Sequence, residues 1–121
     1  MSQDRQALGK IGEDLACQAL ERQGYAIVAR RYRRRGGELD IVARDGPTLV
    51  FVEVKTRDGL EFGSGGEAVT ALKRRRMAGV AEEYMMRHRL TGCACRFDVV
   101  SIDVRKGGPV VEIYQNAFDV T

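Results

Sequence analysis

Apolar and polar residues alternate along this chain in a way that predicts two helices and five strands. Apolar residues recur at helical spacing over residues 4–23 and 70–89. Short apolar stretches bounded by glycine, proline or charged residues are typical of strands, and they cover residues 25–30, 37–44, 49–55, 96–104 and 110–114. The order of helix, three strands, helix and two strands predicts an α/β fold, in which a central mixed sheet of about five strands is flanked by helices.

The first predicted helix carries an apolar stripe and two glycines. The residues of the stripe, which predict the face toward the core, are Leu8, Ile11, Leu15 and Ala19. Asp4 is expected as the N-cap, and Gly24 as the residue that ends the helix. Gly9 and Gly12 lie three residues apart, and glycines within a helix indicate close approach to another backbone.

The second predicted helix places one basic residue on its inner face. Its apolar stripe consists of Met77, Val80, Ala81, Tyr84 and Met85. Lys73 lies four residues before Met77, so it begins the inward-facing stripe, whereas Arg74 to Arg76 are expected to point outward. The segment before this helix, residues 56–66, contains four glycines and Phe62, which predicts a loop over or beside the site described below.

Composition narrows the class of protein. The chain has 121 residues, of which 44% are hydrophobic, so residues 1–121 are expected to form one domain with one core. No apolar run approaches the roughly 18 residues that a membrane span needs. Residues 1–10 are polar and lack the apolar segment of a signal peptide. We therefore expect a cytoplasmic protein without a membrane partner.

Positive charge is clustered rather than abundant. The net charge is only +3, yet five arginines fall within residues 30–35, and residues 73–76 form an unbroken basic run. Clustered basic residues are the electrostatic footprint of proteins that bind phosphate backbones. The alternative is a solvated surface, which is what most charge runs are.

Cysteine and histidine usage excludes several kinds of site. Cys93 and Cys95 are separated by one residue, which is not a usual zinc or redox spacing, and the third cysteine is Cys17. His88 is the single histidine, so a histidine-ligated zinc site and a Ser-His-Asp or Cys-His arrangement are poorly supported. The cysteines are expected to be small buried or half-buried residues in a reducing compartment.

The second and third predicted strands carry charged residues in otherwise apolar stretches. A buried carboxylate is costly unless it is paired or bound to a metal, and these strands contain Asp40, Glu53 and Lys55. A turn with an even number of residues pairs Arg44 with Leu49 and places Asp40 opposite Glu53, with Cβ atoms about 4.5–5.5 Å apart. Two such carboxylates repel each other unless one is protonated or a cation lies between them.

This arrangement suits Mg²⁺, or Mn²⁺, as a cofactor. Magnesium keeps several waters and uses one or two protein carboxylates, so Asp40 and Glu53 suffice, and the backbone carbonyl of Val54 can add a ligand. Lys55 shares a strand face with Glu53, where an ammonium can orient a water or stabilise developing negative charge. Metal-dependent hydrolysis of a phosphodiester is the chemistry that such a set supports.

Two further charged residues have two interpretations each. Glu13 is either a solvated residue of the first helix, as most lone helical glutamates are, or an acid that reaches the hairpin if the glycine side of that helix packs nearby. Lys73 is either a lysine whose stem covers apolar surface near a helix start or a second basic group that faces the carboxylates or a substrate phosphate.

These residues together resemble the PD-(D/E)XK nuclease superfamily, which includes restriction endonucleases and archaeal Holliday-junction resolvases. More closely, nearly the whole chain is similar to the YraN-like family of uncharacterised bacterial proteins. The motifs that carry the resemblance are Gly9-x-x-Gly12-Glu13, Gly36-Gly37-Glu38-Leu39-Asp40, Phe51-Val52-Glu53-Val54-Lys55-x-Arg57, Lys73, Arg96-Phe97-Asp98 and Asn116-Ala117-Phe118. One position departs from the family pattern, because Arg31 stands where asparagine is expected, just before Tyr32.

The resemblance implies a restriction-endonuclease-like core and assigns roles by position. Asp40, Glu53 and Lys55 match the catalytic residues, Glu13 the helical acid and Lys73 the basic residue of the second helix. The residues expected to bind nucleic acid are Arg31, Arg33, Arg34, Arg35, Arg57, Lys73, Arg74 and Arg75. The likeness to junction resolvases implies a homodimer by analogy alone.

Three functions are compatible with the sequence, and we rank them in this order. The first is a Mg²⁺-dependent nuclease that cleaves DNA, including branched or otherwise structured DNA. The second is a non-catalytic nucleic-acid-binding module with a nuclease-like fold, whose binding would depend on salt. The third is an assembly or adaptor protein in which the acids and lysines form a buried ion-pair network. Asp98, which interrupts an apolar run, is expected to have a structural role and an arginine partner.

Overall fold

The computed structural model of the chain describes residues 2–57 and 69–118. Its elements are α1 (Ser2–Arg22), β1 (Ala26–Arg34), β2 (Gly37–Asp45), β3 (Thr48–Arg57), α2 (Ala71–Arg87), β4 (Cys95–Arg105) and β5 (Gly108–Tyr114). All seven predicted elements are present, with ends that differ by a few residues. The predicted loop over residues 56–66 falls mostly outside the described residues, because β3 accounts only for its first two positions.

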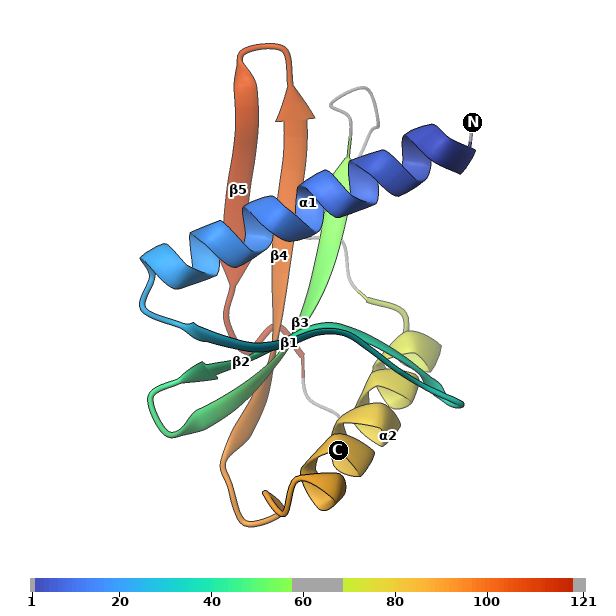
Figure 1. Ribbon diagram of the computed structural model, residues 1–121, viewed down its shortest axis with the longest axis vertical. Coiled ribbons are helices and arrows are strands. Elements are labelled where there is room, and N and C mark those ends of the chain that lie inside the picture. Colours follow the sequence, from blue (N-terminus) through green and yellow to red (C-terminus); the bar gives the residue numbers. More distant parts are fainter. Residues whose placement is uncertain (1, 58–68, 119–121) are drawn as a thin grey trace.

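The five strands form one mixed sheet in the order β1-β2-β3-β4-β5. Every neighbouring pair is antiparallel except β3 and β4, which are parallel and connected through α2. The sheet is strongly twisted, so that β1 and β2 run across the view in which β3, β4 and β5 run lengthwise (Figure 1). The helices α1 and α2 pack against separate apolar clusters of the sheet. The predicted α/β fold with helices flanking a mixed sheet is confirmed.

The helix α1 buries only part of the face that the sequence predicted. Ala19 is buried and Leu15 is half-buried, as predicted. The buried positions of α1 also include Ala16 and Leu20, whereas Ile11 is 50% exposed. A Cβ atom on Gly12 would overlap the Thr56 side chain of β3, so the glycine lets the helix lie close to the sheet. This contact turns the small residues of α1 inward. The predicted N-cap was also wrong, because Asp4 lies inside the helix.

The helix α2 packs as its apolar stripe predicted. Met77, Val80, Ala81 and Tyr84 are buried, and Met85 is half-buried. The ring of Tyr84 makes an edge contact with the ring of Phe51, which joins the helix to β3. The Thr70 side chain accepts a hydrogen bond from the backbone N–H of Lys73 at 3.2 Å and caps the first turn.

The strand β1 is longer than predicted and contains most of the arginine cluster. The sequence predicted a strand that ends at Arg30, but the β1–β2 ladder continues to the pair of Arg34 with Gly37. Antiparallel pairing with β2 supplies the hydrogen bonds that keep this polar segment extended. Within it, Arg31 has a φ of 52°, a left-handed conformation that is uncommon for a residue with a Cβ atom.

A buried polar network ties β4 to the two ends of the chain. Asp98 is fully buried and accepts hydrogen bonds from Tyr25 Oη at 2.9 Å, from Arg96 Nε at 3.0 Å and from the backbone N–H of Asn116 at 2.9 Å. Arg96 also pairs with Asp45 of the β2–β3 turn at 2.8 Å. The predicted arginine partner of Asp98 is therefore confirmed.

The structure also gives the outcome for the helices as membrane spans, for the cysteines and for the single histidine. Neither described helix is long and apolar enough to cross a membrane. Cys17 is buried and Cys93 half-buried as expected, but Cys95 is exposed because it lies at the start of β4. The ring of His88 stacks on Tyr84, and its Nδ1 lies 2.9 Å from the Tyr84 carbonyl oxygen, which is a structural contact at the end of α2.

Candidate active site

The β2–β3 hairpin brings Asp40 and Glu53 together. Arg44 pairs with Leu49, as predicted, across a two-residue turn in which Gly46 has a φ of 60°. A glycine with positive φ at the first central position is typical of hairpin turns that match the strand twist. The same register sets Asp40 across from Glu53, just beyond the last ladder pair of the hairpin.

The two strands separate at this point, and the carboxylate of Asp40 bridges the gap. The β2–β3 ladder ends at the pair of Ile41 with Val52. Beyond it, Asp40 Oδ2 accepts a hydrogen bond from the backbone N–H of Val54 at 2.8 Å. Leu39 packs in the α2-side cluster, whereas Ile41, two residues further along β2, lies in the α1-side cluster.

The proximity of the two carboxylates changes the protonation of Asp40. Glu53 is only 3% exposed. Burial, together with a hydrogen bond to Glu53 and the charge of Glu53, raises the pKa of Asp40 to about 8 against the opposing effects of the Val54 N–H and of Lys73. Two neighbouring carboxylates of which one has a raised pKa are an arrangement in which a proton or a cation binds between them.

Lys73 supplies positive charge to the acidic pair. Its ammonium forms an ion pair with Glu53 Oε2 from the first turn of α2. The Lys73 side chain is 52% exposed, whereas that of Glu53 is 4% exposed, so the lysine reaches inward from the surface. Of the two interpretations of Lys73, the structure supports the one in which it faces the carboxylates.

These groups line a cavity of about 360 Å³ between the β2–β3 hairpin and α2. Its walls include Asp40, Glu53, Lys73, Thr70, Leu72 and Arg76. Arg76 is exposed, as the sequence predicted, and it also lines this cavity, because it follows Lys73 by three residues and such residues are neighbours on a helix. Sequence reasoning missed Leu72 and Thr70, although a threonine just before a helix is a known N-cap signal.

Lys55 and Val54 lie directly beyond Glu53 in β3. Lys55 is half-buried and shares the Glu53 face by strand alternation, and in the β3–β4 register it lies beside Ser101. Val54 is half-buried, and its N–H is the donor to Asp40 described above. Both residues are thus next to the acidic pair, and their roles toward a metal or a phosphate remain predictions.

Glu13 reaches the neighbourhood of Asp40 but is held by arginines of β1. It contacts Arg31 Nε at 3.1 Å and a terminal nitrogen of Arg30 at 3.3 Å. Together with Arg31 and Asp40, it lines a second cavity, of about 700 Å³, between α1 and β1. The predicted approach of the glycine side of α1 to the hairpin is therefore observed, with arginine side chains as the direct partners of Glu13.

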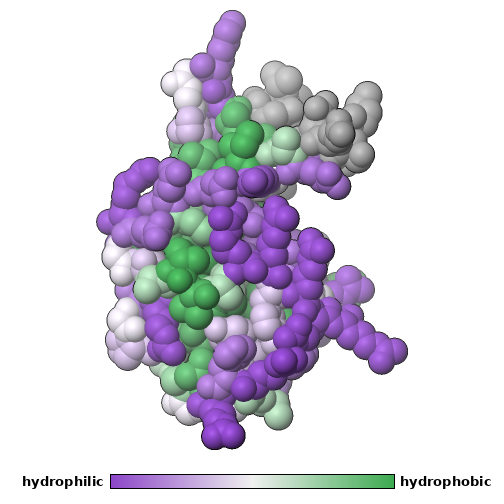
Figure 2. Space-filling view, viewed as in Figure 1, coloured by the Kyte–Doolittle hydropathy of each residue, from purple (hydrophilic) through white to green (hydrophobic). Residues whose placement is uncertain are grey.

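The remaining basic residues surround this part of the molecule. Arg33 pairs with Glu38 at 3.2 Å, and Arg34 pairs with Glu83 of α2 at 3.1 Å. Figure 2 shows hydrophilic side chains along α1 and on the side where the β1–β2 hairpin meets α2. Arg35 and Arg75 are exposed, and Arg57 is half-buried. Arg74 Nε instead donates to the Val69 carbonyl oxygen at 2.7 Å, so its first role is to brace the start of α2.

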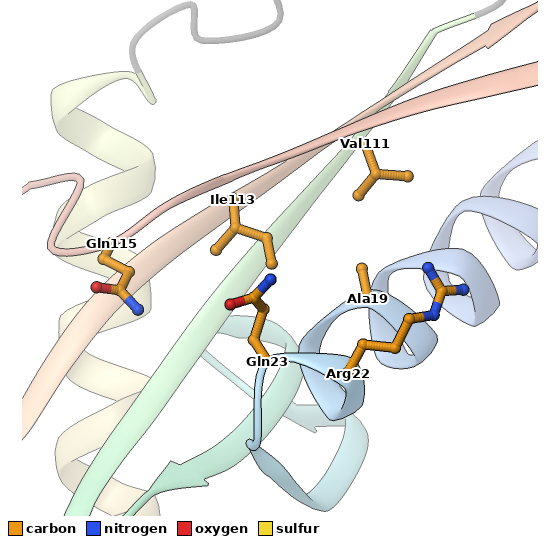
Figure 3. Close-up of a pocket in the computed structure, with 6 residues that line it drawn as sticks. All are labelled: Ala19, Arg22, Gln23, Val111, Ile113 and Gln115. Carbon is orange, nitrogen blue, oxygen red and sulfur yellow. The ribbon is translucent and has the colours of Figure 1, made fainter.

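A hollow elsewhere in the protein lacks this chemistry. It measures about 640 Å³, lies between the end of α1 and β5, and is lined by Ala19, Arg22, Gln23, Val111, Ile113 and Gln115 (Figure 3). It offers one cation, two amides and apolar surface, without a carboxylate, thiol or imidazole among these residues. Its size alone does not make it a catalytic site, and the acidic pair remains the better candidate.

The acidic pair fits a magnesium-type metal better than a zinc-type metal. Within residues 2–57 and 69–118, no group of three or more histidine, cysteine or acidic side chains is arranged to hold a metal. Zinc sites use three or four such protein ligands, whereas Mg²⁺ uses one or two carboxylates and several waters. The Asp40–Glu53 pair, with two carboxylates, corresponds in number and type of ligand to the second kind.

Comparison with known proteins places the chain in a bacterial family. Residues 12–102 match the uncharacterised protein family UPF0102. The UPF0102 protein of Symbiobacterium thermophilum is 47% identical over 112 residues, which cover 92% of this chain and 95% of that protein. The UPF0102 protein of Geobacter metallireducens is 45% identical over 120 residues, which cover 99% and 98% of the two chains. The matched region contains Asp40, Glu53 and Lys73, and the chain therefore belongs to the UPF0102 family.

Proposed function

We propose that this protein is a Mg²⁺- or Mn²⁺-dependent nuclease of the PD-(D/E)XK type that cleaves phosphodiester bonds in DNA. The observation that carries the proposal is the placement of Asp40, Glu53 and Lys73 around one cavity at the point where β2 and β3 separate. A buried pair of carboxylates in which burial and the neighbouring acid raise one pKa, with a basic group beside it, occurs preferentially at functional sites.

Each residue of the site has a defined task in this proposal. The carboxylates of Asp40 and Glu53, with the Val54 carbonyl, would hold the metal, which when bound supplies Lewis-acid activation of water and phosphate. Lys55 lies beyond Glu53 on the same strand face, where its ammonium can orient the attacking water or stabilise charge on the phosphoryl oxygens. The ammonium of Lys73 can contact a phosphate oxygen once its ion pair with Glu53 has broken.

The substrate follows from the charges around the cavity. Arg33, Arg34 and Arg35 extend from the β1–β2 hairpin, and Arg75 is exposed on α2. Basic residues on two elements that flank an acidic pair suit a phosphate backbone that passes over the pair. Branched or otherwise structured DNA is the substrate class that we would test first. The same proposal includes a homodimer, because two copies of the site would suit a DNA substrate with two arms.

The test is cleavage by the wild-type protein and by Glu53→Ala. Plasmid, single-stranded and four-way-junction DNA would be incubated with Mg²⁺ or Mn²⁺, and Glu82→Ala, which removes an exposed glutamate of α2, is the matched control. Cleavage by the wild type and by Glu82→Ala, with loss in Glu53→Ala, is the expected result. Equal cleavage by all three proteins, or cleavage by none, would overturn the proposal.

One observation favours a second candidate, a nucleic-acid-binding module without catalysis. Glu53 is paired with Lys73, and Glu13 with Arg31, so these acids have partners within the chain even without a metal. This candidate predicts salt-dependent DNA binding that is lost when Arg33 to Arg35 are neutralised and is unchanged in Glu53→Ala. Cleavage that depends on Glu53 would exclude it.

A further inference from the structure

We propose that the cavity between α1 and β1 binds a second phosphate of the nucleic acid, adjacent to the one that is cleaved. Arg31 is its principal ligand, and Glu13 is the residue that positions Arg31. This inference rests on the proposed nuclease function, because it assigns the groups that contact the substrate beside the metal. It differs from the role that resemblance assigned to Glu13, which was that of an acid of the catalytic site.

The backbone of β1 is distorted where it delivers Arg31. Residues next to each other in a regular strand point to opposite faces, so Arg30 and Arg31 should not share a partner. Both nevertheless contact the carboxylate of Glu13, at 3.3 and 3.1 Å. The φ of 52° at Arg31 produces this arrangement. An unfavourable backbone conformation inside a strand is the kind of local strain that clusters at functional sites.

Glu13 orients the guanidinium of Arg31 but does not occupy all of the N–H donors of that group. Its two carboxylate oxygens lie 3.1 and 3.2 Å from Arg31 Nε. Guanidinium carries four more N–H donors on its terminal nitrogens, and no described residue accepts a hydrogen bond from them. The Glu13 side chain is 12% exposed and that of Arg31 is 47% exposed, so the anchored atom lies inside and the donors face outward.

The cavity has the walls that a phosphate needs. It measures about 700 Å³, and besides Arg31 it is lined by the donors Gln6, Lys10 and Arg33. The carboxylates of Glu13, Glu38 and Asp40 also line it, of which Glu13 pairs with Arg31 and Glu38 with Arg33. Gly9 lies at its wall, and a Cβ atom at that position would meet nothing within 4 Å, which leaves space for a ligand. Planar guanidinium groups bind phosphate oxygens through paired hydrogen bonds. A phosphate is therefore the chemical group that suits this cavity.

The position of Asp40 links the two cavities. Asp40 lines both the cavity with Arg31 and Glu13 and the cavity with Glu53 and Lys73. A nucleic-acid strand that places one phosphate at the acidic pair would thus place a neighbouring phosphate near Arg31. Since the cavities share this residue, a single strand can occupy both of them.

The experiment measures DNA binding rather than cleavage. A fluorescent DNA duplex would be titrated with protein over a range of salt concentrations, with Ca²⁺ in place of Mg²⁺. Arg31→Asn removes the positive charge and introduces a residue that tolerates the left-handed conformation. Arg31→Gly, the second variant, also removes the charge and tolerates this conformation. Arg30→Gln is the matched control, because Arg30 contacts the same glutamate but does not line the cavity.

Arg31→Asn and Arg31→Gly should weaken binding severalfold and reduce the slope of log affinity against log salt by about 0.9, as the loss of one phosphate contact requires. Arg30→Gln should leave the slope unchanged. Equal slopes for wild type and the Arg31 variants, or equal losses for Arg30→Gln and Arg31→Asn, would overturn the inference. Circular dichroism and thermal unfolding of each variant would show that it is folded.

Two further measurements separate this inference from its alternatives. Glu13→Gln should weaken DNA binding while leaving the Mn²⁺ affinity, measured by calorimetry, within about twofold of wild type, whereas a metal-ligand role for Glu13 requires a loss of about 10-fold or more. Inorganic phosphate should compete with DNA only weakly at constant ionic strength, and strong competition at micromolar phosphate would overturn the nucleic-acid assignment. Because binding is measured, absence of cleavage would contradict the proposed function but not this inference.

Discussion

Lys73 forms an ion pair with Glu53 across the cavity between α2 and β3. In the absence of a metal, this ammonium supplies positive charge to a pair of carboxylates that otherwise repel each other. The lysine is half-exposed and the glutamate is buried, so the lysine can move away while the glutamate cannot. Its location makes Lys73 a competitor for the position that we assign to the metal.

Replacing Lys73 should therefore tighten metal binding. Lys73→Met removes the competing ammonium, and we expect the Mn²⁺ affinity measured by calorimetry to rise several-fold, while the metal-free protein loses about 1 kcal/mol of unfolding free energy because Glu53 loses a partner. Arg76→Met is the control for charge alone, since Arg76 lines the same cavity. A similar gain in both variants would indicate a general charge effect, and unchanged affinity in Lys73→Met would refute the competition.

The raised pKa of Asp40 should make the metal-free protein less stable as pH rises. The folded-state pKa of about 8 lies above the ordinary value of 3.8, so the folded state retains a proton that the unfolded state releases. The resulting stabilisation is fully present below about pH 4 and is lost as pH rises to about 8. Urea unfolding should therefore show that Asp40→Asn gains stability relative to wild type between pH 5 and pH 8.5, by about 1 kcal/mol or more.

Magnesium should oppose this loss of stability at higher pH. Metal binding requires the ionised carboxylates, so its stabilising effect on the wild type should grow from pH 5 to pH 8.5 and be absent in Asp40→Asn. Glu82→Gln, at an exposed position of α2, should behave like the wild type. A wild-type protein whose stability is independent of both pH and Mg²⁺ over this range would contradict the predicted carboxylate pair.

The two glycines of α1 should respond in opposite ways to alanine. A Cβ atom at Gly12 overlaps the side chain of Thr56, whereas one at Gly9 meets nothing within 4 Å. Gly12→Ala should cost about 1–3 kcal/mol through overpacking, and Gly9→Ala should stabilise the protein by up to about 1 kcal/mol through helix propensity. Chemical denaturation measures both. The Thr56→Ala background should recover part of the Gly12→Ala loss, and equal effects of the two substitutions would show that the close approach is absent.

The Tyr25 hydroxyl should contribute to stability through the Asp98 network. It donates to Asp98 at 2.9 Å and accepts from Arg96 at 2.6 Å and Gln115 at 2.8 Å. Tyr25→Phe leaves a fully buried carboxylate with one donor fewer, which should cost about 1–3 kcal/mol. Tyr114→Phe removes a hydroxyl that bonds Glu112 at the surface and should change stability by less than about 0.5 kcal/mol. Thermal unfolding of the two variants tests the difference.

The local pattern of the sequence was sufficient to predict the elements and the central hairpin. Strand alternation and a glycine-containing turn determine which residues face each other, so the pairing of Arg44 with Leu49 and the opposition of Asp40 and Glu53 follow from positions close in the chain. The apolar stripe of α2 is similarly local, because helical periodicity alone selects Met77 and Tyr84. The partner of Asp98 was predictable because a buried carboxylate requires one.

Only the tertiary structure decided how α1 meets the sheet and which charges pair. With Gly12 packed closely against Thr56, Ile11 is exposed and Glu13 meets Arg31. These contacts join segments that are distant in sequence, and helical periodicity does not distinguish between two faces that both carry small apolar residues. The sequence alone therefore determined that Asp40 and Glu53 lie together, whereas the packing of α2 determined that Lys73 meets Glu53 and the packing of α1 determined that Glu13 meets Arg31.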